Sequence, residues 1–177
     1  MRFFACILSL TLAAPAVAQD MNVAAAVDQH IVPGFSALAR ASADLAQTAQ
    51  TTCDATDPGL RAAYGKAFDA LISVSHLRFG PTEAENRGFA LAFWPDPRGS
   101  TPRTLATLIA NEDAIADSVD KYRDVSVAAR GFYALEFLLF DAQFLGVENK
   151  DYTCTLMQTV AADIARTSGD IFLDWSG

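Results

Sequence analysis

Residues 130–140 read RGFYALEFLLF, an apolar run that one glutamate interrupts. A helix that is apolar on every side is normally buried on every side. The stretch is therefore predicted to form the central helix of the fold, with Glu136 in the core. A carboxylate in such a place needs a raised pKa, a cationic partner or a metal ion. Tyr133 lies three residues earlier, so both side chains are expected on one helix face.

Two interpretations of this pair remain open. A phenol and a carboxylate that face one interior point are suitable ligands for a hard cation, and His30 would complete the set if the fold brought it there. Alternatively, Glu136 belongs to a structural network in which Arg78 or Arg130 neutralises it and the Tyr133 hydroxyl donates to it. Buried charges are normally paired, which favours the second interpretation on these residues alone.

The N-terminus has the features of an export signal. Arg2 is followed by an apolar segment over residues 3–12 and by Ala16-Val17-Ala18, a small-residue cleavage site. Residues 1–18 are thus predicted to be a signal peptide cleaved after Ala18. Residues 19–177 are predicted to be one helical domain in the periplasm. The apolar segment is too short for a membrane anchor, and no later run is long enough to span a bilayer.

Charge and cysteine content limit the function further. The 177 residues carry a net charge of −8 without a Lys/Arg cluster, which argues against nucleic acid and anionic lipid as partners. Cleavage of the signal would remove Cys6 and leave Cys53 and Cys154 in an oxidising compartment. We expect them to form a disulfide; the alternative is two buried thiols.

Hydrophobic spacing predicts an all-α, antiparallel helical bundle of the four-helix type, and nothing reads as a strand. Asp57-Pro58 and Thr101-Pro102 each combine an N-cap residue with proline at the first helical position. Three prolines mark residues 94–102 as a loop. Helices are expected at residues 22–50 with an interruption at Pro33-Gly34 and a longer helix from Phe35, at 58–80, at 82–91, at 101–120, from 126 through the central stretch, and at 151–175.

Other candidate residues lie at helix ends and loops. Arg78 could neutralise Glu136 or clamp an anion. His76 is expected either to interact with a helix dipole or to flank a ligand. Trp94, held by Pro95, either caps the hydrophobic core or borders a ligand site. No His-Glu-x-x-His, phosphate loop or Gly-x-Ser-x-Gly motif occurs, so no hydrolytic machinery is visible.

Three blocks resemble the imelysin family of periplasmic or envelope proteins, which is also classed as M75 peptidases. They are residues 78–81 (RFGP), 93–97 (FWPDP) and 131–139 (GFYALEFLL), and the last falls on the family's Gly-x-His-x-x-Glu motif. The similarity extends from about Val27 to Trp175. It implies an all-α fold, export, a link to iron uptake and a metal site at the motif's His and Glu. The peptidase label implies metallopeptidase activity, for which these residues offer no proteolytic site.

Two departures from the family pattern matter. Tyr133 replaces the motif's histidine, and tyrosinate with carboxylate suits ferric iron better than zinc or ferrous iron. The change either retunes the site towards Fe³⁺ or marks its loss. The chain also holds about one of the family's two helical halves, which indicates a truncated form. The leading hypothesis is a module that binds iron or a small ligand alongside envelope iron-uptake proteins; the rival is a non-catalytic interaction module.

Overall fold

The computed structural model describes residues 23–177, which are all-α; within this range no strand occurs. The predicted signal peptide lies outside the described residues. None of the helices between residues 23 and 177 is both long and apolar enough to cross a membrane. The elements are α1 Val23–Ala26, η1 Val27–Ile31, α2 Val32–Ala49, α3 Pro58–Val74, η2 Gly80–Thr82, η3 Ala84–Asn86, α4 Arg87–Leu91, α5 Ser100–Asn111, η4 Ala114–Asp117, α6 Val119–Tyr122, η5 Val127–Ala129, α7 Gly131–Phe140, α8 Ala142–Leu145 and α9 Lys150–Ser176.

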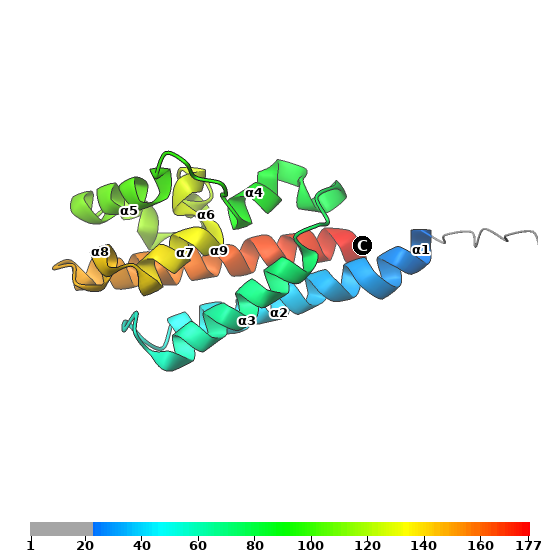
Figure 1. Ribbon diagram of the computed structural model, residues 1–177, viewed down its shortest axis with the longest axis horizontal. Helices are drawn as coiled ribbons and strands as arrows, with labels where there is room; N and C mark the ends of the chain where they lie inside the picture. The colour runs from blue at the N-terminus through cyan, green and yellow to red at the C-terminus, as the bar shows by residue number, and fades with distance from the viewer. Residues whose placement is uncertain (1–22) are drawn as a thin grey trace, which may run out of the picture.

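Helix α9 lies in the middle of the molecule (Figure 1). Helix α2 runs antiparallel to α9 on one side and packs against α3, whereas α7 and the short helices α4 to α6 cover the other side. The core is formed by fully buried aliphatic and aromatic side chains, many of them from α2, α7 and α9, with others from α3, α5 and α6. They include Phe35, Leu38, Leu45, Leu135, Leu138, Leu139, Leu156, Val160 and Ile164. The predicted antiparallel helical bundle is confirmed.

The N-terminal helix continues through Pro33-Gly34 instead of restarting near Phe35. Proline lacks an N–H, and its ring clashes with the carbonyl four residues earlier in a regular α-helix. The wider π-helical turn η1 accommodates this, and the Val32 N–H bonds the Val27 carbonyl, five residues back. Gly34 follows at the contact with α3, where a Cβ would lie 2.7 Å from Cγ1 of Val74. The predicted interruption is therefore a local widening of the helix.

Side-chain caps mark the starts of α3, η4, α6 and α8. Asp57 caps α3, and its side chain accepts a 2.7 Å hydrogen bond from the Leu60 N–H, as predicted from Asp57-Pro58. Helix α5 begins at Ser100 and ends at Asn111, well before the predicted residue 120. The chain turns there because Glu112 adopts a left-handed conformation, with φ of 45°. The central helix begins at Gly131, after a short 3₁₀ turn at Val127–Ala129.

The predicted disulfide between Cys53 and Cys154 is confirmed. It joins the connection between α2 and α3 to the first turns of α9, with a Cα–Cα distance of 5.0 Å and a sequence separation of 101 residues. The two cysteines are far apart in the chain, so the disulfide restricts more than half of the unfolded chain.

Replacing both cysteines by alanine should lower the free energy of unfolding by about 3–5 kcal/mol, as the loop-entropy model expects for a loop of this size. Urea denaturation of the oxidised protein and the double variant would measure the difference. A reductant should destabilise the wild type and leave the variant unchanged. Equal unfolding midpoints for both oxidised proteins would contradict the expectation.

Candidate functional site

The N-terminus of α7 is fixed by a glycine. Gly131 has φ of +76°, and a Cβ there would lie 2.6 Å from the Leu91 carbonyl carbon and in collision with the carbonyl oxygens of Ala90 and Leu91. Only glycine combines this backbone conformation with so close an approach to the end of α4. The glycine of the 131–136 motif thus sets the position of α7, and with it the side chains of Tyr133 and Glu136.

Helix α7 has one outward stripe, and Glu136 lies on it. Phe132, Leu135, Leu138 and Leu139 face the core, whereas residues 133, 136, 137 and 140 recur at intervals of three and four on the opposite side. Glu136 is exposed, so its predicted burial is wrong. Phe140 is 44% exposed, an unusual position for such a side chain. We call residues 133, 136, 137 and 140 the outer stripe of α7.

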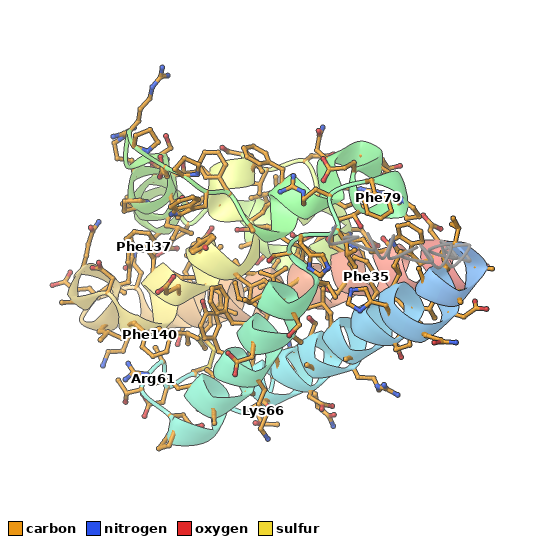
Figure 2. The ribbon with its side chains drawn as sticks, turned by 45° about the vertical axis from the view of Figure 1, so that its right-hand side comes forward. Phe35, Arg61, Lys66, Phe79, Phe137 and Phe140 are labelled. Atoms are coloured by element: carbon orange, nitrogen blue, oxygen red, sulfur yellow. A yellow bond between two sulfur atoms is a disulfide. The ribbon has the colours of Figure 1, made fainter. Side chains whose placement is uncertain are left out.

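Arg61 of α3 holds the C-terminal end of the outer stripe. Its guanidinium lies over the Phe140 ring, 4.7 Å from the centroid, and the two side chains meet in Figure 2. The same group donates 2.5 Å and 3.0 Å hydrogen bonds to the carbonyls of Leu139 and Ala55. A cation next to the stripe is thus engaged by a ring and by backbone carbonyls, and it forms no ion pair with Glu136.

The predicted neutralisation of Glu136 by an arginine is also wrong. Arg78 forms an ion pair with Glu83, five residues away, and Arg130 pairs with Asp163 of α9. Within residues 23–177 neither a hydrogen bond nor an ion pair joins Glu136 to another side chain. The network of Glu136, Tyr133 and arginine does not form. Solvent compensates the carboxylate instead, which leaves it available to a ligand.

Two phenols lie close to Glu136. The half-buried Tyr133 ring packs edge-on against Phe68, with centroids 5.9 Å apart, and burial followed by the Glu136 charge raises the pKa of Tyr133. The buried Tyr64 hydroxyl donates to the Phe132 carbonyl at 3.3 Å. Burial, then Glu136 and Tyr133, also raise the pKa of Tyr64. A bound cation would oppose these effects. No motif in the sequence singled out Tyr64 as a neighbour of Glu136.

A cavity of about 160 Å³ adjoins this cluster, between α2, α3 and α4. Three of the predicted site residues border it: Tyr133, Trp94 and Arg78. Its other walls are mainly apolar and include Phe35, which Figure 2 shows on α2. Trp94 is 67% exposed, so it borders the cavity and does not cap the core. Glu136 lies beyond the cavity, in a shallow depression with Phe137, Phe140 and Asp141.

The two histidines contact each other. Nε2 of His30 lies 3.1 Å from Nε2 of His76, and no hydrogen bond links His30 to Tyr133 or Glu136. Tyr133 and Glu136 thus share the outer stripe of α7, and the third predicted ligand lies elsewhere. Across residues 23–177, no three His, Cys, Asp or Glu side chains converge in the manner of a metal site.

Arg130 was predicted to pair with Glu136, but its partner is Asp163. Its guanidinium binds Asp163 through two hydrogen bonds, of 2.9 and 3.0 Å, and Arg166 donates a third to the same carboxylate at 2.5 Å. Asp163 is 1% exposed. The burial of Asp163 could be predicted from the sequence, because Asp163 lies between Val160 and Ile164 on the apolar face of α9. Arg130, Asp163 and Arg166 form a triad that attaches Arg130, the residue before α7, to helix α9.

The all-α bundle, with Gly131, Tyr133 and Glu136 on one helix, places the chain among imelysin-like proteins. The crystal structure of an imelysin-like protein from Psychrobacter arcticum 273-4 is similar, with a TM-score of 0.74 and 20% sequence identity. The likeness covers 87% of this chain and 48% of that one, so this chain spans about half of that protein's length. Residues 31–177 match the sequence profile of the imelysin family (Peptidase_M75), and the chain belongs to this family. No curated protein matches it.

Proposed function

We propose that this protein is an exported binding module that captures ferric iron, as the ion or as an oxygen-ligated chelate, at the outer stripe of α7. The observation that carries the proposal is Glu136, an exposed carboxylate without a protein partner among the described residues, beside the half-buried phenol of Tyr133. Carboxylate and phenolate oxygens are hard ligands, and the set suits Fe³⁺.

Two protein oxygens leave most of the coordination sphere of iron open. The remaining positions are available to water, to a chelating small molecule or to groups on a second helical half. The stripe is largely aromatic and partly exposed, at Glu136 and Phe140, and such surfaces are typical of interaction sites. The half-length match to the Psychrobacter protein supports completion of the site by a second bundle. Arg78 borders the adjoining cavity, where an anionic chelator would compete with Glu83 for its guanidinium.

The predicted export signal supports a role in acquiring iron outside the cytoplasm. The Cys53–Cys154 disulfide suits an oxidising compartment such as the periplasm. Family resemblance supports envelope iron-uptake proteins as partners. For the alternative, a metallopeptidase, the described residues offer no cluster of three His, Cys, Asp or Glu side chains. We propose a binding function on the strength of Glu136 and Tyr133.

Ferric iron should raise the melting temperature of the wild-type protein and produce a visible tyrosinate-to-iron absorption band. Glu136→Gln and Tyr133→Phe should each weaken binding about tenfold or more, equivalent to about 1.4 kcal/mol. Tyr133→Phe should also abolish the band. Titration with ferric nitrilotriacetate, followed by calorimetry and absorption, measures both effects.

Because Glu136 is exposed, Glu136→Gln can separate an effect on ferric binding from an effect on folding. Glu136→Gln should change apo stability by no more than about 0.5 kcal/mol, because a surface residue without partners contributes little. Glu148→Gln, at an exposed site before α9, is the matched control and should bind as the wild type does. Ferric binding that is absent in the wild type, or equal in all four proteins, would overturn the proposal.

A further inference from the structure

The chain contains two histidines, and the fold brings them into contact. His30 lies in the π-helical turn η1, and His76 lies two residues after the end of α3. Their Nε2 atoms are 3.1 Å apart, and their ring centroids are 5.3 Å apart at an interplanar angle of 35°. Both side chains are exposed. Ligands can therefore approach the two nitrogens from solvent.

Backbone features explain why these rings meet. Gly34 lies one helical turn after His30, and its missing side chain lets α2 approach Val74 closely. His76 follows Val74 by two residues, so the same approach places it opposite His30. The Leu77 N–H bonds the Val74 carbonyl at 2.9 Å, and the Arg78 N–H bonds the His76 carbonyl at 3.0 Å. A tight turn thus fixes the backbone on the α3 side.

The nitrogen spacing fits two ligands of one metal ion. With metal–nitrogen distances of about 2.0–2.1 Å, a separation of 3.1 Å gives a nitrogen–metal–nitrogen angle of about 95–100°. That angle lies between a right angle and the tetrahedral angle. We propose that His30 and His76 form a bis-imidazole site for a divalent transition-metal ion of the zinc and copper class, with water in the remaining positions.

The ligand chemistry separates this site from the proposed ferric site. Imidazole suits Zn²⁺ and Cu²⁺, and Cu²⁺ binds most tightly in the divalent series, whereas Fe³⁺ prefers the oxygens of Tyr133 and Glu136. Without metal, one Nε2–H donates to the lone pair of the other Nε2. Metal binding uses both lone pairs, and the displaced proton moves through solvent to Nδ1 of its own ring. Both imidazoles remain neutral, and no other reactant is needed.

Calorimetric titration of tag-free, chelator-treated protein with Zn²⁺ and with Cu²⁺ tests the site. We expect one ion per chain, with micromolar affinity. His30→Gln and His76→Gln should each weaken binding about tenfold or more, because each removes one of two protein ligands. Both residues are exposed, so both variants should fold. The Cu²⁺ complex should show nitrogen couplings from two imidazoles in its electron paramagnetic resonance spectrum.

Glu136→Gln is the matched control and should bind Zn²⁺ and Cu²⁺ as the wild type does. Loss of ferric binding in that variant, with Zn²⁺ binding retained, would confirm two independent sites. Failure of the wild type to bind Zn²⁺ or Cu²⁺ below millimolar concentration would overturn the bis-imidazole site and leave the ferric proposal untouched. Affinity that falls in only one of the two histidine variants would also overturn it, because the proposal requires both ligands.

Discussion

Replacing Asp163 by alanine should lower the free energy of unfolding by about 3–5 kcal/mol, the range for removing one partner of a buried ion pair. Asp163 accepts two hydrogen bonds from Arg130 and one from Arg166, and its side chain is almost fully buried. Without it, the Arg130 guanidinium keeps, among residues 23–177, only the Arg123 carbonyl, at 3.2 Å. The residue before α7 would then lose its attachment to α9.

Urea denaturation at neutral pH provides the measurement. Asp163→Asn separates charge from shape, since the amide keeps the size of the carboxylate and loses its charge. Asp120→Asn is the control, because Asp120 also faces Arg166, at 3.7 Å, but its side chain is 98% exposed. We expect a change of at most about 1 kcal/mol there. If Asp163→Ala and Asp120→Asn unfold at the same denaturant concentration, the triad does not hold α7 to α9.

Gly131→Ala should destabilise the protein by about 4 kcal/mol or more, at the upper end of what single substitutions do. The left-handed backbone alone costs a non-glycine residue about 1–2 kcal/mol. The new Cβ would also collide with carbonyl groups of Ala90 and Leu91, which belong to backbone and cannot rotate away. Either α4 or α7 must move.

Gly65→Ala is the matched control for this substitution. Gly65 lies inside α3, and a Cβ there meets nothing within 4 Å. Alanine at that position should stabilise the protein by about 0.5–1 kcal/mol through helix propensity. Thermal melting of both variants tests the contrast, and ferric titration of Gly131→Ala tests whether the outer stripe shifts with α7. Similar melting temperatures for the two variants would contradict the role assigned to Gly131.

Local chemistry explains what could be predicted from the sequence. Asp57-Pro58 determines a helix start with two residues, and the disulfide was predicted from the two cysteines that lie outside the predicted export signal. The exposure of Glu136 could not be predicted from composition, because the mean hydropathy of α7 does not distinguish the core-facing side of the helix from the outer stripe. The spacing of residues 133, 136, 137 and 140 indicates the stripe, but only the packing shows that α3 and α8 cover it in part and leave Glu136 exposed.

Pairings between distant residues were the other failure. Arg78 and Arg130 were both assigned to Glu136, since an apolar run seemed to require a cation. Arg78 has a partner five residues away, and Arg130 has one on α9. The His30–His76 contact spans 46 residues and depends on a glycine at a helix crossing and on a π-helical turn. Such details follow from tertiary geometry and not from local patterns.

The central position of α9 has a consequence for how the molecule acquires its structure. Helix α2 finds its main partner about 100 residues later in the chain, and contacts so distant in sequence slow folding. At synthesis rates of about 5–20 residues per second, α2 waits about 5–20 s before α9 exists. Until then, the apolar faces of α2 and α7 are exposed to water and to chaperones. A nascent chain that stops before Lys150 lacks α9 and therefore the side chains that α9 contributes to the core.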